Sequence, residues 1–249
     1  MNIYKSSAEL KGLSKDQLFG HYGAVTGAVF LVASVTLFVT YLPSMLITAR
    51  NIPELIIYYM ISFLVSLLTG ILASGEAYLY LKLICGQPIS AGDVFYGFKS
   101  YPDKAILLQF VLSSLTYICS APALVFYYLY LTTYRTVYIL LMSIAFVIGM
   151  AILVVISLML SQVFYLLQDF PQYSAKELMK MSCQVMKGHK GRLFYLSISF
   201  LPLYLLGIFS FFIAYLWLVP YSNTVMTNFY MDLMKNRANT RQQENAQRL

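Results

Sequence analysis

Residues 174–178 read Ser174-Ala175-Lys176-Glu177-Leu178, and the same pattern stands 84 residues earlier as Ser90-Ala91-Gly92-Asp93-Val94 and 84 residues earlier again as Ser6-Ser7-Ala8-Glu9-Leu10. In each copy a serine precedes an acidic residue by three positions. This spacing is typical of a capping box, in which the serine accepts from a backbone N–H of the first turn and the acid accepts from the backbone N–H of the cap. We therefore expect a short helix after each copy, and three related structural units in the chain.

Long apolar segments follow each copy of the pattern. The chain is 59% hydrophobic and 11% charged, whereas soluble domains carry about 25% charged residues. A segment of about 20 apolar residues is long enough to cross a bilayer as a helix. We expect six such segments, at approximately 24–47, 54–82, 104–132, 136–167, 193–209 and 211–233.

These segments predict an all-α, polytopic membrane protein with a single membrane domain over residues 1–235. Its three parallel repeats, 6–84, 90–168 and 174–235, each combine an amphipathic interfacial helix with a transmembrane hairpin. Residues 236–249 are polar and are expected to form a disordered tail. The run 193–233 also permits one span with a re-entrant or interfacial segment, because about 40 residues barely suffice for two spans.

The distribution of positive charge predicts the orientation. Of the 17 Lys and Arg residues, only Arg50 and Arg135 fall in the loops expected on the far side of the membrane. Cytoplasmic loops carry the excess of Lys and Arg, so both termini are expected in the cytoplasm. The basic side would face anionic inner-leaflet lipid. The net charge of +7 is therefore explained without nucleic-acid binding.

The interfacial helices are expected to press their apolar side chains into the bilayer, with Leu10 and Leu13 against lipid while Lys11 and Lys15 face water. The first and third copies are followed by Gly-His-x-Gly, at Gly20-His21 and Gly188-His189. This motif suits a helix end and a sharp turn into the span. The second copy has Tyr101-Pro102 at the corresponding place.

Glu76 is the one carboxylate well inside a predicted span. It lies on a stripe of small residues at helical spacing, through which another helix can approach closely: Ser62, Ser66, Thr69 and Ala73. Ionisable residues in spans are candidate functional sites. We expect five residues to converge in the cytoplasmic half as a polar network or small binding cavity: Glu76, Gln162, Asn228, Ser161 and Asn223.

Three interpretations of Glu76 remain open at this stage. It is hydrogen-bonded by Gln162 and Asn228 and fixes the packing, or it binds a ligand or proton, or it reaches the headgroup region and meets Lys82 or Lys104. A basic cluster near the third turn is a candidate for contact with lipid headgroups or a partner, together with His21: Lys187, His189, Lys190 and Arg192. No cofactor is implied and no metal ligand set is spaced for binding. Catalytic motifs are also absent from the sequence, which argues against an enzyme.

Several short motifs resemble a family of multi-pass membrane proteins of low-GC Gram-positive bacteria, known as domain of unknown function 975. They are spread over nearly the whole length of the chain: Ser7–Lys11, Gly97–Lys99 with Pro102, Ser174-Ala175, Met179–Ser182, Met186–Lys190, Arg192–Phe194, Leu218–Tyr221 and Phe229–Leu233. The resemblance implies a bacterial plasma membrane and no known activity. More distantly, the layout is similar to the membrane domain of some glycerophosphodiester phosphodiesterases, whose soluble catalytic domain this chain lacks.

Two functional hypotheses follow. The first is a non-enzymatic integral membrane protein that acts through lipids or a membrane-protein partner. It would serve as an accessory or assembly factor of an envelope or export system, or protect the membrane against a peptide or toxin. The alternative is a small transporter or permease subunit that uses the polar site around Glu76.

Overall fold

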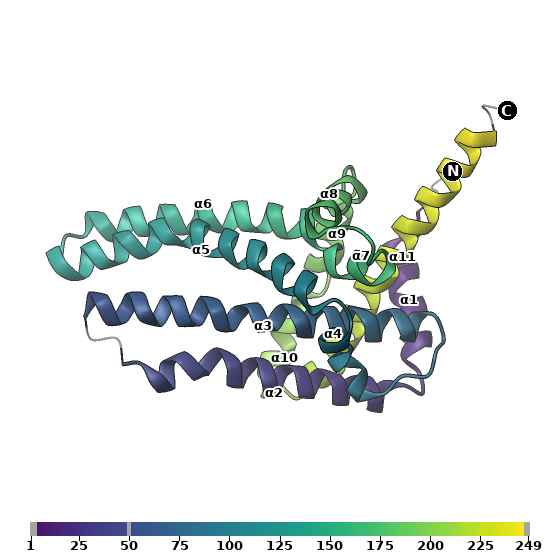
Figure 1. Cartoon of the computed structure of the whole chain (residues 1–249), viewed down its shortest axis with the longest axis horizontal. Coiled ribbons are helices and arrows are strands. Elements are labelled where there is room, and N and C mark those ends of the chain that lie inside the picture. Colours follow the sequence, from purple (N-terminus) through teal and green to yellow (C-terminus); the bar gives the residue numbers. More distant parts are fainter. Residues whose placement is uncertain (1–3, 49–50, 247–249) are drawn as a thin grey trace.

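The computed structural model describes residues 4–48 and 51–246, which form helices joined by short turns and contain no strand. Four long helical stretches make two hairpins whose tips point in the same direction (Figure 1). The first hairpin pairs α2 (Tyr22–Leu46) with α3 (Ile52–Ile84). The second pairs α5 (Pro102–Thr133) with α6 (Val137–Leu160), which continues after a short break as α7 (Val163–Asp169).

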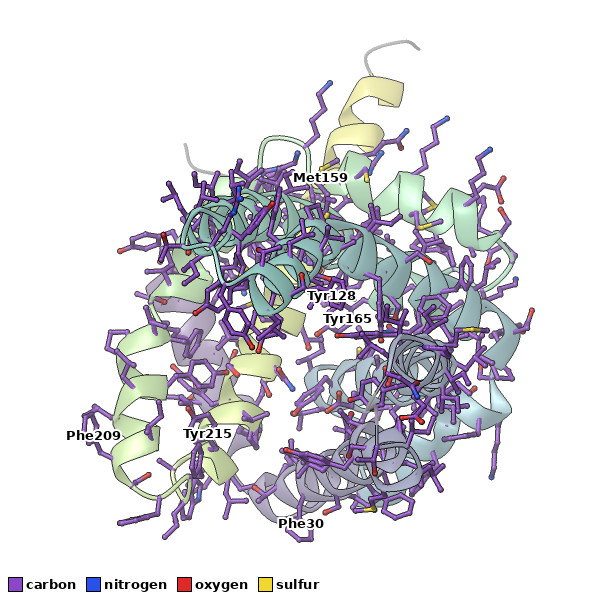
Figure 2. The ribbon with its side chains drawn as sticks, turned by 90° about the vertical axis from the view of Figure 1, so that its left-hand side faces the viewer. Phe30, Tyr128, Met159, Tyr165, Phe209 and Tyr215 are labelled. Carbon is purple, nitrogen blue, oxygen red and sulfur yellow. The ribbon has the colours of Figure 1, made fainter. Side chains whose placement is uncertain are left out.

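The third hairpin differs from the other two in length and direction. It consists of α9 (Lys190–Ile198), α10 (Leu201–Phe209) and α11 (Tyr215–Ala246). The break at residues 210–214 agrees with the predicted boundary between the segments 193–209 and 211–233. Figure 1 shows that this turn does not reach the tips of the long hairpins. In Figure 2, viewed along those hairpins, the helix carrying Phe209 is seen from the side.

Among the described residues, five helical stretches are long and apolar enough to cross a membrane. They are Tyr22–Leu46, Ile52–Ile84, Pro102–Thr133, Val137–Asp169 and Lys190–Phe209. Large apolar side chains along the hairpins are exposed, for example Phe38 at 62%, Ile118 at 67% and Val147 at 65%. So much exposed apolar surface would be unstable in water, which is consistent with a membrane protein.

The predicted sixth segment, 211–233, lies mostly in α11 and is not among these five stretches. Its apolar character is interrupted by polar residues that face the protein: Ser222, Thr224, Thr227, Asn228 and Asp232 are all buried. α11 is thus a core helix whose polar groups bond to its neighbours. It continues as a helix to Ala246, which differs from the disordered tail predicted from residue 236; residues 247–249 lie outside the described part. The Arg, Gln and Ala residues of this stretch are good helix formers.

All three predicted capping boxes are present. Ser6 caps α1 (Ser7–Leu18) with Glu9 as its reciprocal partner, and Ser174 caps α8 (Ala175–Val185) with Glu177. Ser90 and Asp93 close the same arrangement at η1 (Ala91–Phe95), which leads into α4 (Tyr96–Lys99). A short helix therefore follows each copy of the pattern, as the sequence predicts.

Each short helix packs on the last helix of another hairpin. α1 contacts α11, η1 and α4 contact α3, and α8 contacts α6 and α7. Three apolar core clusters form at these contacts, one around Leu10, one around Leu178 and one around Val94. The core therefore lies at the end of the molecule that carries the short helices, away from the hairpin tips.

These contacts correct the prediction that the apolar faces of the short helices lie against lipid. Leu10 is 1% exposed, and Leu178 and Val94 are 0% exposed, because the protein itself covers them. Only the flank of the second copy remains open, where Phe98 is 50% exposed and Tyr101 43%. Periodicity identifies an apolar face but does not distinguish lipid from protein as the surface that covers it.

The two Gly-His turns have nearly the same backbone geometry. Gly20 and Gly188 have φ values of +81° and +84°, which a glycine adopts without strain. His21 and His189 follow with φ/ψ of −112°/−2° and −111°/−1°. The prediction of a helix end followed by a sharp turn is confirmed at both places.

Candidate functional site

Glu76 lies in the inner part of α3, where helices of all three hairpins meet. Its carboxyl group interacts electrostatically with the hydroxyls of Tyr80 on α3 and Tyr165 on α7. Tyr80 is 2% exposed and accepts a hydrogen bond of 3.3 Å from the Asn223 amide of α11. The hydroxyls of Tyr165 and Thr227 are hydrogen-bonded at 3.1 Å. We call Glu76, Tyr80, Tyr165, Asn223 and Thr227 the inner polar cluster.

The position of this cluster follows from how α7 and α11 are held. The Gln168 amide donates to the hydroxyl of Ser74 at 2.7 Å and to its carbonyl at 3.1 Å, which ties α7 to α3. The ring of Tyr165 stacks on that of Tyr230 with centroids 5.2 Å apart, which ties α7 to α11. Tyr165 consequently lies near the middle of the molecule in the view along the hairpins (Figure 2).

Of the five residues predicted to converge, the structure brings Glu76 and Asn223 together, through Tyr80. Asn228 faces α1 instead and donates to Ser14 Oγ at 2.8 Å and to Gln17 Oε1 at 2.6 Å. Gln162 donates to the neighbouring Ser161 hydroxyl at 2.7 Å, while its own buried Oε1 has no hydrogen-bond partner among the described residues. The prediction that Gln162 and Asn228 hydrogen-bond Glu76 is therefore wrong, because each polar group is satisfied or enclosed elsewhere.

The headgroup interpretation of Glu76 is also wrong. Lys82 forms an ion pair of 2.9 Å with Asp93 of η1. Lys104 donates to the backbone carbonyls of Pro171 and Tyr173 in the connection before α8. Both lysines bind groups of the short-helix end, so neither pairs with Glu76. A carboxyl group among hydroxyls and an amide, without a counter-charge, can take up a proton or a small cation.

The sequence interpretation missed Tyr80 and Tyr165. Both lie within one turn of a polar residue that it did select, since Tyr80 is four residues after Glu76 and Tyr165 three after Gln162. Side chains at these spacings share a helix face. The spacing of these tyrosines from Glu76 and Gln162 was therefore a usable signal, but tyrosine is also enriched at membrane interfaces.

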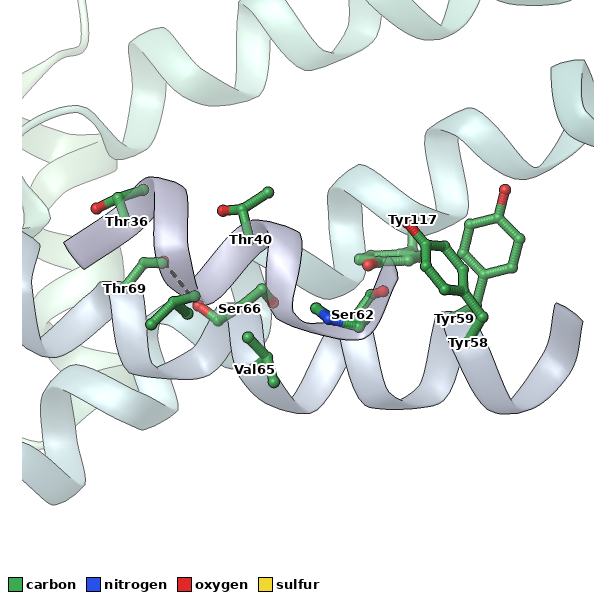
Figure 3. A pocket seen from close by; sticks show the side chains of 11 residues that line it. Thr36, Thr40, Tyr58, Tyr59, Ser62, Val65, Ser66, Thr69 and Tyr117 are labelled. Carbon is green, nitrogen blue, oxygen red and sulfur yellow. Dashed lines mark hydrogen bonds between the residues drawn. The ribbon is translucent and has the colours of Figure 1, made fainter. Parts of the chain in front are cut away.

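A cavity of about 460 Å³ opens between α2, α3 and α5, nearer to the hairpin tips. We call it the outer cavity (Figure 3). Thr36 and Thr40 line it from α2, Tyr117 from α5, and six residues from α3: Tyr58, Tyr59, Ser62, Val65, Ser66 and Thr69. Its volume falls within the range of about 300–1,000 Å³ typical of small-molecule sites. None of the described residues that line it is charged, so it suits a neutral molecule.

The small-residue stripe of α3 faces this cavity. Ser66 bonds to Ser113 of α5 at 3.1 Å, as expected of a helix-packing face. The buried Ser62 Oγ has no hydrogen-bond partner in the described residues. Thr69 and Glu76 are seven residues apart, which is two helical turns. The outer cavity and the inner polar cluster therefore lie along one face of α3.

The basic cluster is divided between structural and exposed residues. Arg192 forms an ion pair with Asp232 of α11 and donates to the Lys5 carbonyl. Its guanidinium also lies 5.1 Å from the Tyr4 ring and 5.0 Å from the Phe229 ring. Arg192 thus clamps the N-terminal segment onto α11, and Asp232, 8% exposed, requires this counter-charge. The expected contact of Arg192 with headgroups stays a prediction, since its side chain is still 22% exposed.

The remaining members of the cluster are on or near the surface. Lys187 is exposed, and Lys190 and His189 are partly exposed. The His189 ring packs edge-on against Tyr4 with centroids 4.5 Å apart. Burial, followed by the charge of Arg192, lowers the pKa of His189. His21 is exposed, and neither histidine caps its helix through a side-chain hydrogen bond.

Groups of His, Cys, Asp and Glu that could hold a metal ion are absent from the described residues. In comparisons with known proteins, the sequence model of one family matches residues 1–237, and its description is "Protein of unknown function (DUF975)". No curated protein and no solved structure matches the chain.

Proposed function

We propose that this chain, which belongs to the DUF975 family of proteins of unknown function, is a non-enzymatic integral membrane protein. It would act through lipids or protein partners. It would serve as an accessory or assembly factor of an envelope or export system, or protect against a membrane-active peptide or toxin. One observation carries the proposal: exposed lysines gather at the end formed by the short helices, at Lys5, Lys15, Lys99, Lys176, Lys180, Lys187 and Lys235.

We place this end in the cytoplasm of a bacterium, with both chain termini on that side of the plasma membrane. The placement follows the rule that Lys and Arg are retained on the cytoplasmic side. Anionic inner-leaflet lipid would attract each lysine near the surface by about 1 kcal/mol. Three parallel repeats are supported by the three capping boxes and by the packing of each short helix on the end of another hairpin.

We further propose that the third hairpin enters the inner leaflet without crossing the membrane. The course of α9 and α10 across the long hairpins supports the re-entrant or interfacial alternative over six full spans (Figure 1). The buried polar residues of α11 support it as well. They give this helix the character of a core helix within the protein, and not that of a second apolar span. The two chain ends remain on the same side under either topology.

The partner hypothesis can be tested at a groove between α8 and α11. This groove has a volume of about 340 Å³ and is lined by Glu177, Lys180, Gln184 and Arg237 among others. A photo-crosslinking residue at Gln184, in native membranes, is expected to give discrete adducts with a protein or lipid. The matched control is Ser143, exposed on α6. Identical adduct patterns at both positions would contradict a specific partner at this face.

A transporter or permease subunit is the second candidate, because the outer cavity and Glu76 lie along one face of α3. In proteoliposomes loaded with a pH-sensitive dye, this hypothesis predicts proton uptake above that of empty liposomes. Glu76→Gln should reduce uptake to the background, whereas Asp103→Asn, an exposed acid at the start of α5, should not. Wild-type protein that gives only background flux argues against proton coupling.

A further inference from the structure

A second groove lies between the N-terminal elbow and the third hairpin. It has a volume of about 470 Å³. The end of α1 and the start of α2 form one wall, and α10 and α11 form the other. Its lining is almost entirely apolar or aromatic, including Phe19, Leu203, Leu206, Trp217 and Leu218, and Lys15 is the single charged residue among the described residues that line it. The inner polar cluster and the outer cavity share no residue with it.

Lys15 is positioned at this groove by an aromatic ring. Its ammonium group lies 5.9 Å from the centroid of the Tyr221 ring, which also lines the groove. Lys15 is exposed, so its N–H groups remain available to a ligand. One turn earlier on α1, the ammonium group of Lys11 lies 4.6 Å from the Phe200 ring. The groove therefore combines an apolar floor with a positive charge at Lys15.

The groove lies where the chain passes from the short-helix end into its first long apolar helix. The Gly20-His21 turn joins α1 to α2, which is a candidate span. Tyr22, Trp217 and Tyr221 line the groove, and Trp and Tyr are the residues enriched where hydrocarbon meets water. An apolar chain can therefore lie in the groove while its polar head stays at the level of Lys15.

We propose that this groove binds one anionic phospholipid of the inner leaflet, with its phosphate at Lys15 and an acyl chain along Leu203, Leu206 and Leu218. The proposal deepens the lipid branch of the proposed function and rests on it. Charge complementarity selects an anionic head, because none of the described residues that line the groove carries a carboxylate. The apolar floor selects a lipid over free phosphate, which would leave those side chains uncovered.

Trp217 provides a direct test, because it is the single tryptophan of the chain and lines the groove. The full-length protein is reconstituted in phosphatidylcholine bilayers that contain either brominated phosphatidylglycerol or brominated phosphatidylcholine. Bromine quenches tryptophan fluorescence on contact. We expect the brominated anionic lipid to bind next to Trp217 about fivefold more tightly than the brominated phosphatidylcholine. This factor corresponds to the attraction of about 1 kcal/mol that one lysine exerts at an anionic lipid surface.

Two variants locate the preference. Lys15→Gln should bring the ratio of the two lipids close to one, and Lys176→Gln, a neutralised exposed lysine on α8, should keep it. Unchanged emission of both variants in bromine-free bilayers verifies that the fold is retained. Equal quenching by both lipids in the wild type overturns the proposal, as does a preference that survives Lys15→Gln.

Inorganic phosphate is the competing probe for a site that recognises a headgroup alone. Added phosphate is expected to leave the quenching unchanged, and relief of quenching by it would overturn the lipid assignment. The crosslinking experiment at Gln184 reports separately on the proposed function. If adducts form at Gln184 but Trp217 shows no lipid preference, only the groove proposal is contradicted. If Trp217 shows the preference but no adducts form at Gln184, only the partner hypothesis is contradicted.

Discussion

At the scale of single residues, buried polar groups set the contacts between elements. Asn228 is 4% exposed and joins α11 to α1 through Ser14 and Gln17. Ser14 and Ser182 occupy corresponding places after the first and third copies of the capping pattern, and both are 0% exposed. Ser182 donates to the Met159 carbonyl at 2.8 Å, joining α8 to α6. A small hydroxyl thus anchors a short helix in each case.

Replacing Asn228 by Leu should loosen α1 from α11. The change removes two hydrogen bonds and leaves Ser14 and Gln17 without their donor, which costs about 1–3 kcal/mol for each buried group left unsatisfied. Thermal unfolding in detergent measures the loss of stability, and proteolysis near Phe19, which is 85% exposed, reports the release of α1. Gln172→Leu at an exposed position is the control. Equal stability of the two variants would contradict the role given to Asn228.

His189 should make stability dependent on pH. Its pKa is lowered in the folded protein by burial and by Arg192, so the unfolded chain takes up this proton more readily. The protonation of His189 therefore does not change the free energy of unfolding above its ordinary pKa of about 6.5. It lowers this free energy as the pH falls from there towards the pKa in the folded protein. His189→Gln should flatten the melting temperature over that interval relative to wild type. Gln172→Leu, at an exposed position without a titratable side chain, should leave the profile unchanged; a flattening by both variants would argue against the assignment.

At the scale of elements, glycines permit the close contact between α3 and the second short helix. A Cβ on Gly75 would lie 1.7 Å from the Val94 carbonyl oxygen of η1, and one on Gly97 would lie 2.0 Å from the Ile71 carbonyl oxygen. Neither neighbour is a flexible side chain, so the backbones themselves would have to separate. The ion pair of Lys82 with Asp93 holds the same two elements together.

Gly75→Ala is expected to destabilise the protein by about 3 kcal/mol or more, because overpacking against a backbone cannot be relieved by a rotamer change. Gly12→Ala is the matched control on α1, where an added Cβ meets nothing within 4 Å. It should raise stability by about 0.5–1 kcal/mol, the usual gain from replacing a helical glycine. Melting temperatures in detergent give both values. The assigned contact is refuted if the two substitutions have effects of the same sign.

At the scale of the whole molecule, the short helices link hairpins to one another. α1 reaches the end of the third hairpin, η1 and α4 the first, and α8 the second. All three apolar cores lie at these links. In the hydrocarbon region lipid is as apolar as the side chains, so burial there supplies little driving force. The hairpins are therefore held together mainly from the end that we place in the cytoplasm.

Cysteine labelling in oriented vesicles tests this topology. In a chain whose three native cysteines are replaced, Thr136→Cys at a hairpin tip should react with an impermeant reagent from the outside, and Lys187→Cys only from the inside. Phe212→Cys, in the turn between α10 and α11, should be protected from the outside reagent because the third hairpin stays in the inner leaflet. Labelling of Phe212→Cys from the outside would instead establish six spans. External labelling of Lys187→Cys would reverse the orientation.

The sequence by itself determined the helical class, the helix starts and the turns, because these depend on residues within one or two turns of each other. The capping box of Ser174 and Glu177 and the turn at Gly188 and His189 depend only on residues that are close together in the sequence. Hydropathy likewise located the first four apolar stretches to within about two residues at each end, but it did not predict the break that divides the fourth into α6 and α7. The polar site was only partly predictable. Glu76 was selected for its charge, and Asn223 for its place in the predicted segment 211–233.

Only the tertiary structure decided which groups meet. Asn228 turns to Ser14 instead of Glu76, Arg192 is occupied by Asp232, and Leu10 is covered by protein instead of lipid. The first two contacts join residues more than 35 positions apart in the sequence. In the third case, protein and lipid are both apolar surroundings, and the sequence pattern does not distinguish them. A periodic pattern states that a side chain needs an apolar or polar neighbour, whereas the identity of that neighbour depends on how the hairpins and short helices pack.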